Sequence, residues 1–476
     1  MWFFLYLYKA MKFLTLTTLI LLFGLTGCQE NLDFNDSEGL IDYTNEPENQ
    51  IIYTADKEIL IPSILNARWR DFNAIVDMSD DNIRNTLIVE LSNRTNENIS
   101  YLQTKSNLEL SVYSLLYTFL KTASIRSEDE LQNMTLGNQR NTLIVENANR
   151  LANQNTSGLQ NLSTAKLVQL GYSWYLPTTY NTLINYDNGK ISKITSPYQF
   201  KLHDNLGRSM DVLKIVKTNE SLNNTYEYLG VYHIQTSPDN FNLQLAGSND
   251  LFKWNHIIEL DYDAHQGDIV KWNQGYLIAY EEDKTQGINN IALRYYDDYQ
   301  DLISNNTSYT KSINTSLHSF GVEGTPDIRN VSGSSPQNGN IQIGFHYYDG
   351  DVDRLAMGVL KNGDYWKAWK DALSEYNFRE MDFKGNIGSR KSFQYGNTDL
   401  LLQEARLIKG DWSTWKIMLG LNVFYTEVLI STPAGSTSFA NPSIIQTENN
   451  KYAITLFLPT EGNATSENNG GVIYEK

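Results

Sequence analysis

The second half of the chain repeats a strand-opening tripeptide at nearly constant intervals. The tripeptides are centred on Asp211, Asp268, Asp327 and Ser443. These positions lie 57, 59 and 116 residues apart, and 116 is twice 58. Alternating apolar residues and Asn, Gly, Asp and Ser turns follow each tripeptide, which is typical of antiparallel hairpins. Repeats of about 40–60 residues built from short strands predict a β-propeller.

One repeat unit is hidden in the double interval between Asp327 and Ser443. The segment from Ser389 to Phe393, followed by QYGNTDLLLQEARL, fits this unit slightly out of phase. We therefore predict an all-β propeller of five blades over residues 171–476. Three tryptophans close outer segments of these units and are expected to pack between neighbouring blades: Trp254, Trp369 and Trp415.

The first half contains a different repeat. The heptapeptide RNTLIVE occurs at residues 84–90 and again at 140–146, an offset of 56. Ser79 and Thr135 precede the two copies as good helix N-caps. The sequence predicts a small all-α domain made of two duplicated units over residues 55–170. The repeated Arg, Asn and Glu side chains either bind a ligand or join one helix to the next loop, and we favour the second interpretation.

The N-terminus has the features of an export signal. An apolar run from Phe13 to Leu25 is followed by Leu25-Thr26-Gly27-Cys28, which resembles a bacterial lipoprotein signal. This resemblance implies a signal peptide at 1–27, a lipid on Cys28, and anchoring to the bacterial cell envelope, with the outer membrane expected. A plain signal peptide or a short transmembrane anchor are the alternatives. The polar segment 28–54 reads as a flexible tether.

Composition limits the partners of the chain. Its net charge of −17 argues against nucleic acid and anionic membranes, which both require clustered basic charge. Its 30 tyrosines and 9 tryptophans suit carbohydrate surfaces, although ordinary all-β proteins share this composition. The six histidines show no metal-ligand spacing, and Asp349–Asp353 lacks the Gly and Glu of a calcium loop. We expect no metal and no cofactor.

Over residues 200–476 the chain resembles the five-bladed propellers of family 43 and family 32 glycoside hydrolases. The resemblance rests on the segment Ser248 to Trp254, on Asp268, on the stretch Glu323 to Pro326, and on the five-unit period. In those families three carboxylates line the central channel, and such carboxylates serve as acid, base or nucleophile in glycoside cleavage.

The resemblance implies catalytic roles for Asp211 in blade 1, Asp268 in blade 2 and Glu323 in blade 3. Glu323 lies one residue further from its proline than the family pattern has it, and Ser209 stands where blade 1 should carry its aspartate. Substrate-binding candidates are Asp327, Arg390 and Asp204. Histidines that could approach the channel are His203, His233, His265 and His346.

Two functions from different classes remain open. The first is a surface-anchored glycoside hydrolase that acts on a polysaccharide or oligosaccharide. The second is a non-catalytic glycan-binding lipoprotein that has lost its active site. Because Asp211, Asp268 and Asp327 occupy one phase of the repeat, they have a structural alternative, in which they bond the start of a neighbouring strand.

Overall fold

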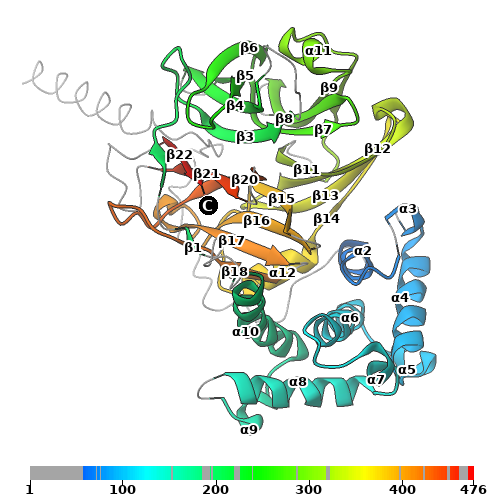
Figure 1. Cartoon of the computed structure of the whole chain (residues 1–476). Helices are drawn as coiled ribbons and strands as arrows, with labels where there is room; N and C mark the ends of the chain where they lie inside the picture. The colour runs from blue at the N-terminus through cyan, green and yellow to red at the C-terminus, as the bar shows by residue number, and fades with distance from the viewer. Residues whose placement is uncertain are drawn as a thin grey trace, which may run out of the picture.

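A computed structural model shows a helical unit followed by a five-bladed β-propeller (Figure 1). The described residues are 57–475, apart from 71, 76, 152–153, 185–192, 195–196, 219–225, 238–239, 286–287, 318–321, 396–397, 422–423, 448–450 and 460–469. The expected signal peptide, the tether and Cys28 lie outside them. Among the described residues, no helix is both long and apolar enough to cross a bilayer.

The propeller consists of five four-stranded antiparallel sheets, so the predicted number of blades is confirmed. Blade 1 contains β3 (Asp211–Lys217), β4 (Tyr228–Ser237), β5 (Asn240–Ser248) and β6 (Asn255–Asp261). Blade 2 contains β7 (Ala264–Trp272), β8 (Gly275–Thr285), β9 (Ile288–Tyr296) and β10 (Tyr309–Ile313). Blade 3 contains β11 (Glu323–Gly333), β12 (Gly339–Tyr348), β13 (Asp353–Lys361) and β14 (Tyr365–Lys370). Blade 4 contains β15 (Arg390–Tyr395), β16 (Thr398–Arg406), β17 (Trp415–Leu421) and β18 (Phe424–Glu427).

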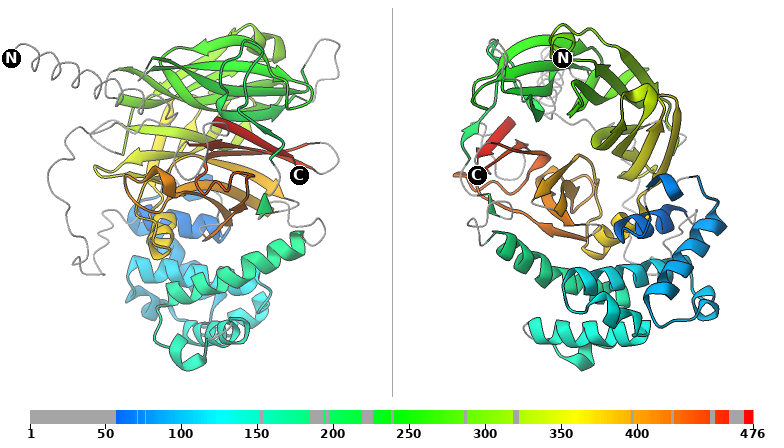
Figure 2. Two further views of the ribbon diagram at one scale, coloured as in Figure 1. Left: turned by 90° about the vertical axis from the view of Figure 1, so that its left-hand side faces the viewer. Right: turned by 45° about the vertical axis from the view of Figure 1, so that its right-hand side comes forward.

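Blade 5 closes the ring with strands from both ends of the propeller. Its inner strands are β20 (Ala440–Gln446), β21 (Tyr452–Leu458) and β22 (Gly470–Glu475). The outer strand is β2 (Gln199–Phe200), in which Gln199 pairs with Ile473 and Phe200 with Val472. The innermost strands β3, β7, β11, β15 and β20 contact one another in this order, and β20 contacts β3 (Figure 2). Such closure protects the sheet edges that would otherwise be exposed.

All three tryptophans share a core with a neighbouring blade, as predicted. Trp254 of blade 1 is 2% exposed and shares a core with Ile473 of blade 5. Trp415 of blade 4 packs with Phe457 of blade 5. Trp369 of blade 3 shares a core with Leu400 and Leu402 of blade 4, and this core extends into blade 5 and the helical unit.

The innermost strands bulge near their starts, and these bulges correct the predicted phase of blade 1. The register shifts fall between Asp211 and Lys214, between His265 and Asp268, and between Gly324 and Asp327. Lys214 is therefore the blade 1 counterpart of Asp268 and Asp327, and Asp211 corresponds to His265 and Gly324. The prediction that the three aspartates share one phase is therefore wrong. Asp211 is shifted by three residues relative to the other two, and so small a shift leaves the spacing between the tripeptides nearly unchanged.

The helical unit precedes the propeller in sequence and contains both RNTLIVE copies. Its helices are α2 (Lys57–Asn66), α3 (Phe72–Ile75), α4 (Asp80–Arg94), α5 (Ile99–Gln103), α6 (Asn107–Thr122), α7 (Glu128–Gln132), α8 (Leu136–Arg150), α9 (Thr156–Leu159) and α10 (Thr164–Ile184). The copies occupy α4 and α8, which Ser79 and Thr135 cap. The expected boundary at residue 170 lies inside α10. A short parallel pair follows, between β1 (Lys193–Ile194) and β19 (Leu429–Ile430).

The repeated arginines join each helix to a following loop, as we favoured from the sequence. Arg84 Nη2 donates to the carbonyls of Gln103 and Lys105 at 3.1 and 2.7 Å. In the second copy Arg140 Nη2 donates to the carbonyls of Gln160 and Leu162 at 2.9 and 2.7 Å. The identical heptapeptide thus encodes one intramolecular contact twice.

Replacing Arg140 with methionine is expected to lower the free energy of unfolding by about 1.5–3 kcal/mol, because two carbonyls lose a charged donor. Urea denaturation followed by circular dichroism measures this loss. A matched control is Lys409→Met, whose partner Asp351 lies on the exposed surface, and here a change below about 1 kcal/mol is expected. Equal effects of the two variants would contradict the structural role of Arg140.

The helical unit is docked on blades 3 and 4. Asp77 pairs with Lys361 of β13 at 2.8 Å and with Lys367 of β14 at 3.8 Å. α2 also contacts α12 (Ala372–Glu380), the helix between blades 3 and 4, and α10 contacts β18. One apolar core runs through the helices and the outer parts of blades 3 to 5. The two units are therefore a single packed body.

Candidate functional site at the channel mouth

The interior of the channel holds two aspartates that join blades. Asp268 accepts from Lys391 Nζ of blade 4 at 2.6 Å and from the Ile328 amide of blade 3 at 2.8 Å. Asp327 accepts from the amide and hydroxyl of Ser392 at 3.1 and 2.6 Å. Both carboxylates are fully buried. Their bonds match the structural alternative considered from the sequence, in which these aspartates bond a neighbouring strand.

Lys214 fills the corresponding place in blade 1. Its ammonium donates to the Ser389 hydroxyl and the Arg390 carbonyl, both at 3.2 Å, and to the Pro442 carbonyl at 2.5 Å. Burial lowers the pKa of Lys214 to about 8, although the Asp268 charge opposes this shift. A buried charge cluster thus spans the middle of the ring, and it consists of Lys214, Lys391, Asp268 and Asp327.

The other candidates from the sequence are also buried and bonded. Glu323 Oε1 accepts from the amides of residues 316 and 317, both at 2.7 Å. Arg390 donates through Nη2 to the Phe345 carbonyl at 2.5 Å. Asp204 accepts from Tyr232 Oη at 2.6 Å and from Arg208 Nε at 2.8 Å. Among the six channel candidates from the sequence, Asp211 alone is partly exposed.

A second set of polar residues gathers where the innermost strands begin, which we call the channel mouth. The first bulge residue of four blades has a positive φ: Val212 at 54°, Gln266 at 52°, Thr325 at 45° and Asn441 at 49°. Two of these residues are β-branched, for which this conformation is strained. Strain of this kind clusters at functional sites. The facing positions on the second strands are His233, Glu281 and His346.

In blade 2 a histidine lies between two carboxylates. His265 Nε2 is 3.6 Å from Glu281 Oε1 and 3.2 Å from Asp283 Oδ1. Burial alone would lower the pKa of His265, but the two carboxylates raise it to about 9. Burial likewise opposes ionisation of Glu281, yet His265 and His346 hold its pKa below the usual range. Glu281 is therefore an ionised carboxylate beside an imidazolium.

Blade 3 continues the polar arc toward blade 4. The Thr325 amide donates to Glu281 Oε2 at 3.0 Å, and the Thr325 hydroxyl bonds His346 Nδ1 at 2.6 Å. His346 Nε2 lies 3.8 Å from Asp353 Oδ1, and Asn386 donates to Asp353 Oδ2 at 2.6 Å. Burial raises the pKa of Asp353.

Asp211 lies in blade 1 at the end of this arc. It is the residue of β3 that pairs with His233 of β4. The His233 ring lies 5.9 Å from the His265 ring, so the arc runs from blade 1 into blade 2. Burial raises the pKa of Asp211, and the hydroxyl of Ser209, at 2.7 Å from Oδ1, opposes this shift. The mouth thus combines a carboxyl whose pKa is raised, that of Asp211, with one whose pKa is lowered, that of Glu281.

Sequence reasoning named Asp211, His233, His265 and His346 but missed Glu281, Asp283, Asp353 and Glu404. Glu281, His346 and Glu404 follow Tyr280, Phe345 and Gln403 near the ends of second strands. Glu404 plays the same part in blade 4, where its carboxylate accepts from the amides of Ser389 and Asn441. The pattern of a large residue followed by His or Glu is a usable signal. It is obscured because the hairpins that precede it differ in length.

Replacing Gly324 with alanine is expected to displace Glu281. The added Cβ would lie 2.0 Å from Glu281 Oε2, a contact that real structures do not contain. Because Thr325 and Asn289 hold this carboxylate, we expect a loss of about 1–3 kcal/mol in unfolding free energy. Thermal denaturation measures it. Gly137→Ala in α8 is the control, since its added Cβ would lie 3.8 Å from Thr135 Oγ1, an ordinary contact, and alanine favours a helix. A Gly324 variant as stable as the Gly137 variant would contradict this reading.

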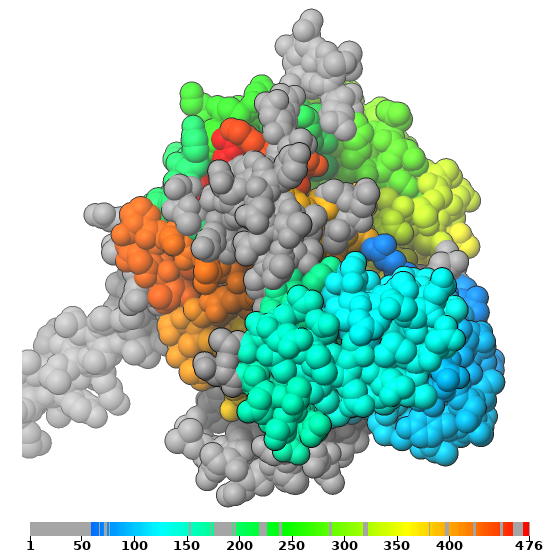
Figure 3. All heavy atoms as spheres, turned by 60° about the horizontal axis from the view of Figure 1, so that its bottom comes forward, coloured from blue at the N-terminus to red at the C-terminus, as the bar shows by residue number. Residues whose placement is uncertain are grey.

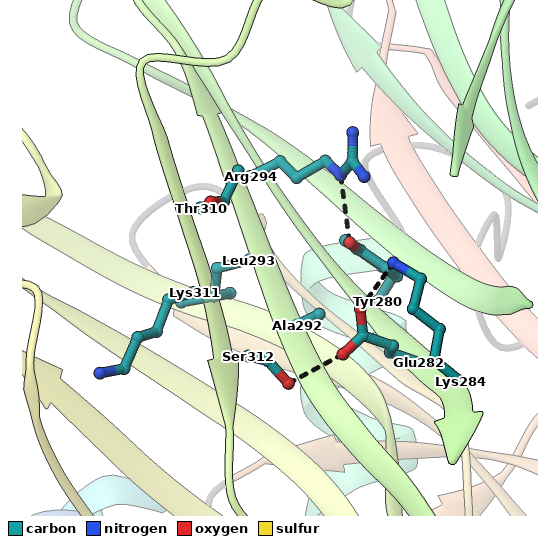
Figure 4. Close-up of a pocket in the computed structure, with 9 residues that line it drawn as sticks. All are labelled: Tyr280, Glu282, Lys284, Ala292, Leu293, Arg294, Thr310, Lys311 and Ser312. Atoms are coloured by element: carbon teal, nitrogen blue, oxygen red, sulfur yellow. Dashed lines mark hydrogen bonds and ion pairs between the residues drawn. The ribbon is translucent and has the colours of Figure 1, made fainter. Parts of the chain in front are cut away.

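Two hollows lie away from the mouth. One of about 230 Å³ opens on blade 2, where Figure 4 shows Arg294 beside Tyr280 and Glu282 bonded to Ser312 and Lys284. The other, of about 520 Å³, lies between α10, α12 and β18. Within the described part of the chain, no group of three or more His, Cys, Asp or Glu side chains is arranged to hold a metal ion.

No protein-family model matches this chain, and no curated protein is similar to it in sequence. Its structure is similar to that of a GH43 endo-arabinanase from Bacillus licheniformis, with 13% identity, a TM-score of 0.37, and coverage of 59% of this chain and 96% of the other. It is similar to an exo-1,5-alpha-L-arabinanase from a bovine ruminal metagenomic library, with 9% identity, a TM-score of 0.38, and coverage of 59% and 94%. An N-acetylgalactosamine deacetylase from F. plautii is similar too, with 12% identity, a TM-score of 0.37, and coverage of 59% and 91%.

Proposed function

We propose that the channel mouth hydrolyses glycosidic bonds of a polysaccharide or oligosaccharide. One observation carries this assignment. Asp211 is partly exposed with a raised pKa, while Glu281 in the next blade is ionised between histidines. Two carboxyl groups whose environments push their pKa values apart are the usual basis of acid and base roles.

The chemistry requires one proton donor and one negative charge. Protonated Asp211 would donate its proton to the leaving glycosidic oxygen, for which a raised pKa is an advantage. Ionised Glu281 would stabilise the positive charge that develops on the sugar ring. Water then adds to the anomeric carbon, and the proton that it releases returns to the Asp211 carboxylate. His265 and His346 keep Glu281 charged, and the strained bulges at Val212 and Thr325 aim the surrounding groups.

An activity screen tests this function. The purified protein is incubated with p-nitrophenyl glycosides and with polysaccharides of arabino, xylo, fructo and galacto configuration, and released sugar is measured. Hydrolysis of at least one substrate is expected in the wild type, together with its loss in Asp211→Asn. Hydrolysis that survives unchanged in Asp211→Asn would show that the activity lies elsewhere.

A glycan-binding propeller without turnover is the second candidate. The observation that favours it is the burial of Asp268 and Glu323, two of the three residues for which the resemblance to glycoside hydrolases implies a catalytic role. Retention of a glycan by the protein without any release of sugar, over the whole substrate panel and between pH 4 and 9, would support this candidate and exclude the first.

Cys28 is the proposed lipid attachment site and would tether the protein to the envelope. Replacing Cys28 with alanine is expected to move the protein from the membrane fraction to the soluble fraction, because stable anchoring depends on the acyl chains. Metabolic labelling with radioactive palmitate and fractionation measure both effects. Ser37→Ala, in the same tether, is the matched control and should leave labelling intact. A labelled Cys28→Ala protein would contradict the assignment.

A further inference from the structure

The two copies of the helical repeat carry the same exposed side chains. In α4 these are Asn82, Asn85, Val89 and Asn93, and in α8 they are Asn138, Asn141, Val145 and Asn149. Each residue of the second set lies 56 positions after its counterpart. We call the two sets the amide faces. All eight side chains are exposed, with Val89 at 41% and Val145 at 48%.

This identity is not explained by folding. Two buried positions of the same helices have diverged, since Ile83 corresponds to Gln139 and Leu91 to Asn147, while the buried leucine and isoleucine at the centre of each heptapeptide are kept. Substitutions at exposed positions usually change stability by less than about 0.5 kcal/mol, so folding does not preserve such residues. A surface kept in both copies while part of the core changed indicates a binding role.

The amide faces have their hydrogen-bonding capacity unused. No side chain of the six asparagines bonds another residue in the described parts of the chain, whereas the neighbouring Arg84 and Arg140 are fully engaged. Each amide offers two donors and an acceptor. The faces carry no charge, although the whole protein carries −17. In Figure 3 the cyan part of the chain, which includes α8, forms a broad open surface.

We infer that the two amide faces bind a neutral, hydroxyl-rich polysaccharide. Uncharged amides that both donate and accept suit sugar hydroxyls, and they offer nothing to an anionic polymer. A partner with a single epitope would need one face, whereas a polymer presents the same unit many times and engages two identical faces at once. Binding at two linked sites gains affinity without any new contact. The inference stands apart from catalysis at the channel mouth.

Affinity electrophoresis of the full-length protein tests this inference. The gels contain arabinan, arabinoxylan, galactan or levan, or polygalacturonate as the anionic comparison. We expect retardation by at least one neutral polymer and none by polygalacturonate. Asn85→Ala with Asn93→Ala, or Asn141→Ala with Asn149→Ala, should weaken apparent affinity by roughly ten-fold or more, and all four together should abolish retardation. Alanine favours helices, so the variants remain folded.

The outcomes separate this inference from the proposed function. Gln132→Ala, an exposed amide of α7 outside the faces, should leave retardation unchanged. The four-fold variant should hydrolyse short p-nitrophenyl glycosides like the wild type, and Asp211→Asn should lose hydrolysis but keep retardation. A wild type that no neutral polymer retards, or a four-fold variant retarded as strongly as the wild type, would overturn the inference.

Discussion

Replacing Asp268 with alanine is expected to lower the free energy of unfolding by about 3–5 kcal/mol, the usual cost of breaking a buried ion pair. Asp268 is fully buried and bonds Lys391 at 2.6 Å, and Lys391 is only 6% exposed. Without Asp268, the ammonium groups of Lys391 and Lys214 share a single carboxylate in the cluster, that of Asp327. The substitution also removes the acceptor of the Ile328 amide. Urea denaturation monitored by tryptophan fluorescence measures the loss.

Two further variants show whether charge is the cause. The combination of Asp268→Asn with Lys391→Met removes both partners, and we expect a smaller loss than with Asp268→Ala, because no uncompensated charge remains. Asp351→Ala is the surface control, since its pair with Lys409 is exposed and worth less than about 1 kcal/mol. An Asp268→Ala protein within about 1 kcal/mol of the wild type would refute the structural role of the buried charge cluster.

Replacing Asp211 with asparagine is expected to reduce kcat/KM by about 10²–10⁴-fold, the usual contribution of general acid catalysis. Asparagine keeps the size of the side chain, but its amide has no acidic proton that it could transfer to a leaving oxygen. Because Asp211 is partly exposed, the free energy of unfolding of the variant should differ little from that of the wild type. Steady-state kinetics on the best substrate of the screen measures the activity, and thermal denaturation verifies the fold.

The pH dependence gives a second measurement on the same residue. In the proposed mechanism hydrolysis requires protonated Asp211 and ionised Glu281, so activity should fall as pH rises through the pKa of Asp211 and as pH falls through that of Glu281. The Ser209 hydroxyl stabilises ionised Asp211, so Ser209→Ala should raise the pKa of Asp211 further and move the alkaline limb to higher pH. The described partners of Glu281 are His265, Asn289 and Thr325, so the acid limb should stay in place. An alkaline limb that does not move would remove Asp211 as the acid.

The architecture of the propeller was predictable because its signals are local. A four-stranded blade needs alternating apolar residues and short polar turns, and both are visible within one unit. The spacing of 59 residues between Asp268 and Asp327 gives the length of one unit, and this length divides the second part of the chain into five units. The duplicated heptapeptide was equally informative, since Arg84 and Arg140 contact loops that lie about twenty residues further along the same repeat.

The channel mouth depends on pairings that the sequence does not display. The bulge in β3 moves Asp211 three residues away from the position of Asp268, and no spacing of tripeptides reveals a bulge. Glu281 becomes a site residue because its strand lies beside His265, and because Thr325 arrives from the next blade. Ring closure, not the order of residues, decides these neighbours.

By itself the sequence determined the five repeated units, the helical duplication and the fact that the two amide faces carry the same residues, because repetition is a property of the chain. Only the tertiary structure decided which acids are buried in the charge cluster and which reach the mouth. The physical reason is that the surroundings of a carboxyl group come from other blades. Asp268 meets Lys391 across the channel, whereas the described partner of the Asp211 carboxyl is the hydroxyl of Ser209 and burial raises its pKa.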